Sequence, residues 1–252
     1  MHRYKTEQIR NVVLLSHGGA GKTSLSEAML FDAGAINRLG RVEEGTTTSD
    51  WDPDEQKRRM STTTAVLPLE WHGHKLNILD APGYVDFAGE MKSAARVADL
   101  ALVVVDGAAG VEVGTEQVWA YADAEKLPRM VLVNRLDREN ADFDRAVEAL
   151  RARFGHQVVA LQLAVGAQAG FRGVVDLIGR RAYLGPECSE AEVPAELADA
   201  VEAARDHLVE AIAEVDDDLL AKYLDGEEIA ADVLWAALRT AVCQGAVAPV
   251  LA

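Results

Sequence analysis

The stretch SHGGAGKTS, residues 16–24, constrains the fold of this chain more than any other feature. The apolar run NVVLLS (11–16) predicts a buried strand before it, and TSLSEAMLFDAG (23–34) predicts a helix after it that ends at Gly34. A glycine-rich turn between a strand and a helix is the setting of a phosphate-binding loop. The strict pattern GxxxxGK[ST] fails only at its first position, which Ser16 occupies.

The residue types in this loop suit a nucleotide phosphate. Gly18, Gly19 and Gly21 let backbone N–H groups point at an oxyanion, assisted by the helix N-terminus. Lys22 can reach the β- and γ-phosphates as a point charge, and the Thr23 hydroxyl can ligate Mg²⁺. The loop alone chooses neither the base nor the reaction.

The rest of the first 155 residues alternates short apolar runs with helical patterns, which predicts an α/β fold with a mostly parallel sheet. Residues 64–71 and 75–82, joined by HGH, predict one antiparallel hairpin. Two further buried strands, at 98–106 and 128–135, each precede a helical pattern. The polar segment 36–61 has no steady period, so we expect a long, mobile and functional loop.

The sequence changes character after residue 155. The patterns at residues 158–166 and 173–184 predict strands. A helix after them is indicated by apolar residues at helical spacing, namely Leu197, Val201, Ala204, Leu208, Ile212 and Val215. A second helix is expected at about 228–242.

These patterns predict a division of the chain. Residues 1–155 would form the core of a nucleotide-binding domain, and 156–245 an α/β insertion subdomain. Residues 246–252 would begin the last strand of the core.

The net charge of −16 is concentrated in the predicted insertion. Between Glu187 and Asp232 there are sixteen acidic residues and two basic ones, so this segment carries −14. It is either a solvated helical surface or a docking face for a basic partner, since a field of one sign steers association. Direct binding of nucleic acid by this segment is disfavoured because phosphates would be repelled.

The remaining compositional signals exclude several classes of protein. No apolar run approaches the roughly 20 residues of a membrane span, and the N-terminus lacks the apolar middle of a signal peptide. We therefore expect a cytoplasmic protein. Cys188 and Cys243 lie far apart and predict neither a disulfide nor a metal pair, and His72 and His74 suit a hairpin turn.

Two more motifs narrow the ligand. Asp80 ends a predicted strand and is placed to hold Mg²⁺ through water, while the N–H of Gly83 can sense a γ-phosphate. In NRLD (134–137), the Asp137 carboxylate can accept hydrogen bonds from N1–H and the exocyclic amine of guanine, which adenine does not offer. Asn134 would tie this loop together, and Arg135 would lay its guanidinium over the base. The three motifs in this order predict a bound guanine nucleotide.

The motifs in this order resemble the nucleotide-binding domain of bacterial elongation factor G, over essentially the whole chain. They are SHGGAGKTS, TTTSDW, KRRMST, DAPGYVDF, NRLD and LQLAVGAQAGFRGVVDLI. The resemblance implies a Ras-like G domain with an α/β insertion, and GTP hydrolysis that is stimulated by the ribosome during translocation. It implies GTP or GDP and Mg²⁺ as cofactors. Its partners would be the ribosome and, through the acidic insertion, the ribosomal stalk protein, and we expect a monomer away from the ribosome.

The resemblance assigns the site residue by residue. It implies GTP binding by residues 16–24, 80–84 and 134–137, written out as Ser16, His17, Gly18, Gly19, Ala20, Gly21, Lys22, Thr23, Ser24, Asp80, Ala81, Pro82, Gly83, Tyr84, Asn134, Arg135, Leu136 and Asp137. Lys22, Gly83 and Tyr84 would act in catalysis. The metal would be held by Thr23, Ser61 and, through water, Asp80, with Thr62 as an alternative to Ser61.

The chain departs from the family at several of these positions. Gly19 replaces an aspartate, Ser61 a threonine and Arg135 a lysine. Tyr84 stands where the family has a histidine that positions water on the γ-phosphate. A phenol with a pKa near 10 is no base at pH 7, but it can orient water, so we expect a divergent paralogue with slow intrinsic hydrolysis.

Three alternatives remain at this point. The chain could be a GTP-dependent binding switch with little or no hydrolysis, or part of a ribosomal-protection or release-type factor. An ATP-dependent kinase is disfavoured because Asp137 has no good use for adenine. The resemblance covers the front third of a complete factor, and the last guanine-contacting loop would follow residue 252, so we expect reduced nucleotide affinity.

Overall fold

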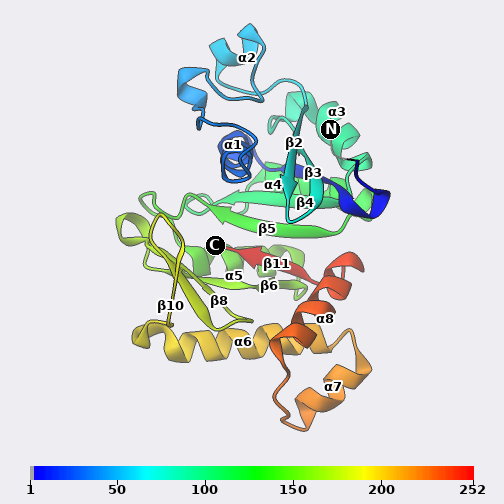
Figure 1. Ribbon diagram of the computed structural model, residues 1–252, viewed down its shortest axis with the longest axis vertical. Coiled ribbons are helices and arrows are strands. Elements are labelled where there is room, and N and C mark those ends of the chain that lie inside the picture. The colour runs from blue at the N-terminus through cyan, green and yellow to red at the C-terminus, as the bar shows by residue number, and fades with distance from the viewer. Residues whose placement is uncertain (1–2) are drawn as a thin grey trace. The chain divides into compact units, whose positions relative to one another are not determined.

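The computed structural model describes residues 3–252, which fall into two compact units. Among the described residues, the first unit contains those up to 104 and 112–127, and the second contains 105–111 and 128–252. Together they contain eleven strands and eight α-helices within the described residues, and strands alternate with helices from β3 to β6 (Figure 1). This is the predicted α/β class, with mainly parallel strands, one antiparallel hairpin and a separate antiparallel sheet.

The first unit has four neighbouring strands in the order β2-β3-β1-β4. β1 pairs in parallel with β3 and with β4, while β2 and β3 form the predicted antiparallel hairpin. The turn of this hairpin places His72 and Gly73 at φ 46° and 77°. The strands are β1 (Ile9–Leu15), β2 (Ala65–Trp71), β3 (His74–Asp80) and β4 (Leu100–Asp106).

Helices pack against these strands. α1 packs against β2 and β3, and α3 packs against β1 and α4. Val13, Leu14 and Leu15 at the end of β1 are fully buried. The helices of this unit are α1 (Lys22–Asp32), α2 (Pro53–Arg58), α3 (Ala88–Arg96) and α4 (Val113–Ala124), with 3-10 turns η1 (Thr6–Gln8), η2 (Val42–Glu44) and η3 (Val85–Phe87).

The segment 36–61 is more structured than the sequence predicts. It contains η2 and the two-turn helix α2, and its Thr47, Ser49, Asp50 and Glu55 are buried. Periodicity cannot reveal such a segment, because it is held by polar hydrogen bonds and not by an apolar face.

The second unit contains three parallel strands and a four-stranded antiparallel sheet. β11 lies between β5 and β6 and pairs in parallel with both. The antiparallel sheet has the order β10-β9-β8-β7. The strands are β5 (Arg129–Asn134), β6 (Val158–Ala160), β7 (Gln162–Val165), β8 (Gly173–Asp176), β9 (Arg181–Leu184), β10 (Ser189–Ala191) and β11 (Ala248–Leu251).

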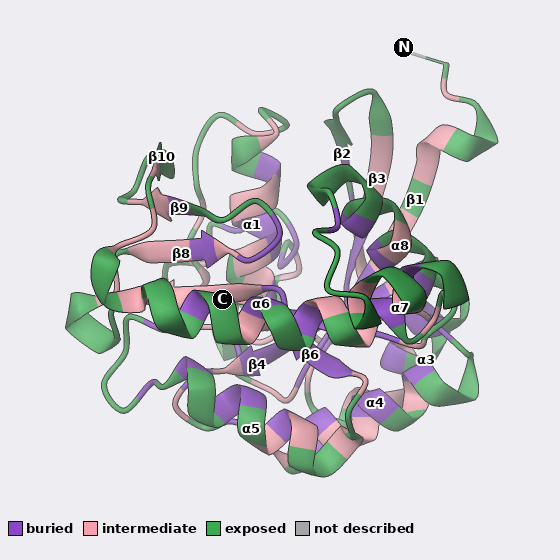
Figure 2. Cartoon of the chain, turned by 90° about the horizontal axis from the view of Figure 1, so that it is seen from below, coloured by how far each residue is buried: buried purple, intermediate pink, exposed green. Residues whose placement is uncertain are grey.

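Four helices complete this unit. α5 and α6 pack against β6, and α6 also contacts α7 and α8. In Figure 2 the long helix α6 alternates buried and exposed residues, and its buried residues include Val201, Leu208 and Ile212. The helices are α5 (Phe143–Phe154), α6 (Ala198–Ala213), α7 (Asp217–Leu224) and α8 (Ala231–Cys243), with 3-10 turns η4 (Gln168–Gly170) and η5 (Ala195–Leu197).

Several elements here differ from the sequence prediction. The expected strand 158–166 divides at Leu161 into β6 and β7, which belong to different sheets. The Leu161 N–H donates to the Val250 carbonyl of β11 at 2.8 Å, while its own carbonyl accepts from the Leu177 N–H at 3.2 Å. Residues 173–184 form two strands. Helix α7 is unpredicted, because it has only eight residues and its start is fixed by a polar cap, Asp216, which accepts from the N–H groups of Asp218 and Leu219.

Two further findings concern compositional expectations. Cys188 and Cys243 are free thiols, and both are exposed. Among the described residues, no helix combines the length and the apolar character that crossing a membrane requires.

Candidate nucleotide-binding site

The phosphate-binding loop lies between β1 and α1, as predicted. Gly19 and Gly21 adopt φ 88° and 98°, values that side-chain-bearing residues rarely adopt, and Gly21 is the N-cap of α1. Ser16, at the position where the strict motif has glycine, is fully buried. Its hydroxyl donates to the His17 carbonyl at 2.5 Å and accepts from the Lys22 ammonium at 2.7 Å, so Ser16 holds the lysine over the loop.

Lys22 is the first residue of α1, and it is buried. Burial lowers the pKa of the Lys22 ammonium to about 8, although the charge of Asp80 acts in the opposite direction. Such a desolvated cation gains from a phosphate placed beside it.

A group of oxygen atoms surrounds the start of α1. The Thr23 hydroxyl donates to Asp80 Oδ2 at 2.9 Å and lies 3.3 Å from the Ser61 hydroxyl. Ser61 in turn donates to Asp50 Oδ1 at 2.7 Å. The alternative residue, Thr62, donates its hydroxyl to Glu55 at 3.1 Å. Of the two predicted metal-ligand candidates, Ser61 is therefore the one beside Thr23.

The balance of buried charge in this unit fits a divalent cation. Burial raises the pKa of Asp80, opposed by Lys22 and Thr23, and burial likewise raises the pKa of Asp50. Buried carboxylates of this unit outnumber the buried cation, and Asp80 Oδ1 is buried without a hydrogen-bond partner. Buried charges in proteins are paired or coordinate metals. The buried charged residues here are Lys22, Glu27, Asp50, Glu55 and Asp80.

The donor set also fits the chemistry of Mg²⁺. Hydroxyl and carboxylate oxygens are its protein ligands, and phosphate oxygens and waters usually complete its shell. Within residues 3–252 there is no group of three or more His, Cys, Asp or Glu that could hold a metal by protein ligands alone.

The segment after β3 lies against the phosphate loop. A Cβ atom on Gly83 would lie 2.5 Å from Lys22 Nζ and 3.0 Å from the Gly18 backbone, so this segment passes very close to the phosphate loop. The Tyr84 ring packs on Gly18, where a Cβ atom would lie 2.9 Å from two ring carbons. Tyr84 is 44% exposed, and Ala81, which follows Asp80 in the same segment, is fully buried. The residues predicted to sense and hydrolyse the γ-phosphate are thus beside the loop that would bind it.

His17 connects the phosphate loop to α4. Its Nε2 lies 3.6 Å from Glu112 Oε1, and Gly114 approaches the ring so closely that a Cβ would meet Nδ1 at 2.5 Å. Sequence reasoning missed the contact with Glu112 because the two residues are distant in the chain. It also missed the place of Asp50, although the motif TTTSDW contains it.

The NRLD loop follows β5 in the second unit. The side-chain Oδ1 of Asn134 accepts from the Arg135 N–H at 2.9 Å, and the backbone carbonyl of Asn134 accepts from the Gly107 N–H at 2.8 Å. Leu136 is buried, and its carbonyl accepts from the Gln168 N–H at 2.9 Å. Asp137 is exposed at the end of the motif, where its carboxylate is open to a ligand.

Arg135 has a partner that the sequence does not reveal. Its backbone lies at φ 62°, and its guanidinium donates to Asp106 Oδ2 at 3.1 Å. Asp106 Oδ1 accepts from the N–H groups of Ala108 and Ala109. Burial acts to raise the pKa of Asp106, but the hydrogen bonds from Ala108, Arg135 and Ala109 outweigh it, and the pKa is lowered. Asp106 therefore fixes the direction of the guanidinium.

The predicted site residues are thus assembled in two groups, each described within its own unit. Ser16 to Ser24, Ser61 and Asp80 to Tyr84 lie together in the first unit. Residues 134–137 lie in the second unit with the loop that begins at Asp106.

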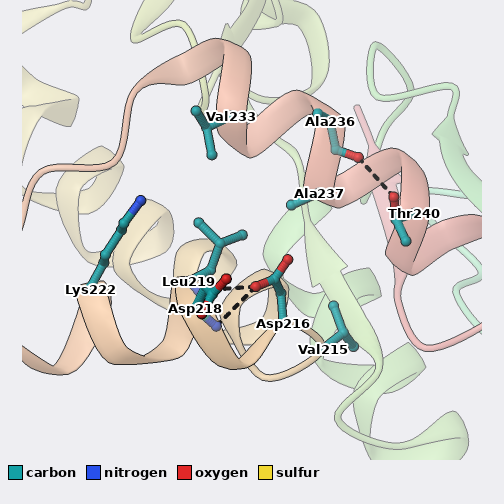
Figure 3. A pocket seen from close by; sticks show the side chains of 9 residues that line it. All are labelled: Val215, Asp216, Asp218, Leu219, Lys222, Val233, Ala236, Ala237 and Thr240. Atoms are coloured by element: carbon teal, nitrogen blue, oxygen red, sulfur yellow. Dashed lines mark hydrogen bonds between the residues drawn. The ribbon is translucent and has the colours of Figure 1, made fainter.

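A groove of about 330 Å³ lies between α7, which belongs to the acidic segment, and α8, most of which follows it (Figure 3). Its lining includes Leu219 on α7 and Val233 and Ala237 on α8. Asp218 and Lys222 lie on its α7 side.

A phosphate loop between a strand and a helix, together with an NRLD loop on an α/β fold, defines a P-loop nucleotide-binding protein. The chain belongs to the family described as "Elongation factor Tu GTP binding domain", whose match covers residues 7–244. It is therefore a member of a GTPase family that binds guanine nucleotides.

A solved structure supports the fold. A crystal structure of a protein from Thermus thermophilus is 43% identical to this chain, with a TM-score of 0.90. The similarity covers 96% of this chain but 37% of that one, so the chain spans little more than a third of the length of its relative.

The Asp106–Arg135 pair yields a stability prediction. Asp106→Asn removes the charge that Arg135 faces, and we expect the free energy of unfolding at pH 7 to fall by about 1–3 kcal/mol. Because the native pKa of Asp106 lies below the ordinary 3.8, its contribution is present above pH 3.8 and is lost as the pH falls through the native value. Urea unfolding at pH 7 and across the acid range measures this, with the exposed Asp206→Asn as control. Equal losses in both variants at pH 7 would contradict the pairing.

Proposed function

We propose that this chain is the GTP-binding and GTP-hydrolysing domain of a ribosome-stimulated translational GTPase of the elongation factor G type. The observation that carries the proposal is the cluster in which Thr23 contacts both Ser61 and Asp80 next to the buried Lys22. The family match supports the GTPase class, and the sequence motifs support the elongation factor G type.

The phosphates would be bound mainly by the first unit. The N–H groups of the loop from Gly18 to Ser24, including Ala20, would point at the β-phosphate, and Lys22 would contact the β- and γ-phosphates. Mg²⁺ would be held by the hydroxyls of Thr23 and Ser61, and by Asp80 and Asp50 through water. When bound, this cation neutralises charge that develops on the phosphate oxygens.

Hydrolysis would depend on the segment Asp80–Tyr84. Ala81 and Pro82 would direct the backbone of this segment. The Gly83 N–H would donate to the γ-phosphate from the position that Gly83 has beside Lys22. Phosphoryl transfer needs positioning and charge more than proton abstraction. The Tyr84 hydroxyl would therefore orient the attacking water without acting as a base, and the ribosome would supply the acceleration.

The base would be read by the NRLD loop. Asp137 would accept two hydrogen bonds from guanine, and Arg135, aimed by Asp106, would cover a face of the base. Asn134 and the buried Leu136 hold the loop in shape.

We also propose the domain division suggested by the sequence, with residues 1–155 and 246–252 as the G domain and 156–245 as an acidic insertion. The −14 segment within it would bind the ribosomal stalk protein through the groove between α7 and α8. On the same proposal, the protein would be located in the cytoplasm and would be a monomer away from the ribosome.

One competing function has an observation in its favour. Tyr84 packs on the phosphate loop at Gly18, which would suit a GTP-dependent binding switch in which hydrolysis is slow or absent. A ribosomal-protection or release-type factor would share the nucleotide motifs. Release of inorganic phosphate from GTP, with and without ribosomes, separates a GTPase from a switch, because a switch binds GTP without ribosome-dependent turnover.

The guanine assignment predicts a change of base preference. Asp137→Asn replaces an acceptor of two hydrogen bonds by an amide that also donates, so GDP affinity should fall about a hundredfold or more. Xanthosine diphosphate, which carries a carbonyl in place of the exocyclic amine, should then bind better than GDP. Titration of labelled nucleotides measures both, with the neighbouring exposed Glu139→Gln as control. Unchanged GDP affinity, or tighter ATP than GTP binding by the unaltered protein, would refute the assignment.

The role of Tyr84 predicts a difference between two variants. With ribosomes present, Tyr84→Phe should lower the rate of phosphate release about tenfold, because one hydrogen bond to water is lost. Tyr84→His should retain or raise the rate. Tyr183→Phe in the second unit is the control, and equal rates for Tyr84→Phe and the unaltered protein would exclude an orienting role.

The partner proposal predicts an electrostatic effect on association. Replacing Asp217 and Asp218 together by Asn should slow binding to the isolated stalk protein severalfold at low salt, and the difference should shrink as salt is added. A two-charge control far from the groove is Glu7→Gln with Asp32→Asn. If both double variants bind at the same rate as the unaltered protein, the acidic segment is only a solvated surface.

A further inference from the structure

The segment 36–61 is joined to the phosphate site through Ser61, whose hydroxyl lies 3.3 Å from Thr23 Oγ1. A serine side chain has no β-branch to restrict χ1, so its own packing does not determine where the hydroxyl points. The hydroxyl is directed by its hydrogen bond to Asp50 Oδ1 at 2.7 Å, and the position of the residue itself is set by the backbone around it.

That backbone is held by a single buried carboxylate. Glu55 Oε1 accepts from the N–H of Thr62 at 2.8 Å and from the N–H of Thr63 at 3.1 Å. The same oxygen lies 3.1 and 3.2 Å from the two threonine hydroxyls, which donate to it. Glu55 is only 1% exposed, so these bonds are shielded from water.

The short helix α2 is built to aim this side chain inward. Asp52 is its N-cap and accepts from the Asp54 N–H at 2.7 Å, and Pro53 takes the first helical position. The helix ends at Arg58, and its C-cap Arg59 adopts φ 56°, a left-handed conformation that turns the chain out of the helix before Ser61. Glu55 is the one buried residue of this helix.

Other carboxylates hold the neighbouring parts of the segment. Glu27 on α1, also 1% exposed, accepts from the N–H groups of Gly40 and Thr48 at 3.1 and 2.9 Å. Glu90 on α3 accepts from the Thr64 N–H at 2.9 Å. The three consecutive N–H groups after Ser61 thus all donate to carboxylates, two of them to Glu55.

We propose that Glu55 is a positioning residue for GTP hydrolysis, which fixes the backbone of Thr62 and Thr63 and thereby places the Ser61 hydroxyl beside Thr23. The consequence is that this part of the loop keeps its arrangement without a γ-phosphate, because the protein's own carboxylate supplies the acceptor. Loss of Glu55 would affect the use of GTP and leave GDP binding nearly intact, since the phosphate loop does not contact Glu55. Only this kinetic consequence rests on the function proposed above.

Two substitutions separate the hydrogen bonds from the charge. Glu55→Gln keeps an oxygen that can accept from both N–H groups, whereas Glu55→Leu keeps the approximate size and removes the acceptor. Glu43→Leu is the matched control, because Glu43 lies exposed in the same segment.

Hydrogen exchange of the Thr62 and Thr63 amides is measured first, on the full chain with GDP and without nucleotide. We expect slow exchange in the unaltered protein, exchange about tenfold faster or more in Glu55→Leu, and less than about threefold change in Glu55→Gln and Glu43→Leu. Fast exchange in the unaltered protein would overturn the proposal without any variant, so a Glu55→Leu chain that fails to fold leaves it testable.

GTP turnover with ribosomes and GDP affinity are measured second. We expect kcat to fall about tenfold or more in Glu55→Leu, to recover in Glu55→Gln, and GDP affinity to change less than about threefold. Equal loss of kcat in Glu55→Leu and Glu43→Leu, or a parallel loss of GDP affinity, would overturn the positioning role. Absence of turnover in the unaltered protein would refute the proposed function, while the exchange data would still decide whether Glu55 holds the loop.

Discussion

The structure of the first unit depends on how buried charge is balanced around the start of α1. Lys22 and several carboxylates of this unit are buried. Burial lowers the pKa of Lys22 and raises the pKa values of Asp50 and Asp80, which in each case favours the neutral form. An arrangement of this kind is costly when empty and favourable when a phosphate and a divalent cation are bound. The desolvation cost of these charges in the free protein would therefore strengthen the binding of a phosphate and a cation that pair with them.

Backbone hydrogen bonds offset part of the desolvation cost of the buried carboxylates. Glu27 and Glu55 are buried as acceptors of N–H groups from the segment 36–64, so their burial orders a stretch that has no apolar face. Carboxylates that accept several backbone hydrogen bonds are well stabilised even when desolvated. The same hydrogen bonds that order the segment therefore also help to place the Ser61 hydroxyl in the proposed metal site.

The NRLD loop, which we propose to bind the base, follows a different principle. It is exposed at Asp137, and it is held from behind by the buried Leu136, by Gly107 and by the Asp106–Arg135 pair. A rigid support with one free carboxylate favours selection between bases, because a wrong base would leave that carboxylate unpaired at close quarters.

The sequence by itself determined the α/β class, the strand–loop–helix of residues 11–34, the hairpin of β2 and β3 and the order of the nucleotide motifs. Apolar periodicity and glycine at positive φ are local properties, so they can be read without neighbours. Only the tertiary structure decided that Ser61 and not Thr62 lies beside Thr23, that Asp106 aims Arg135, that residues 158–166 divide between two sheets, and that 36–61 is anchored. Each of these depends on a hydrogen bond between residues that are distant in the chain or folded back by a turn, and such bonds leave no periodic trace in a sequence.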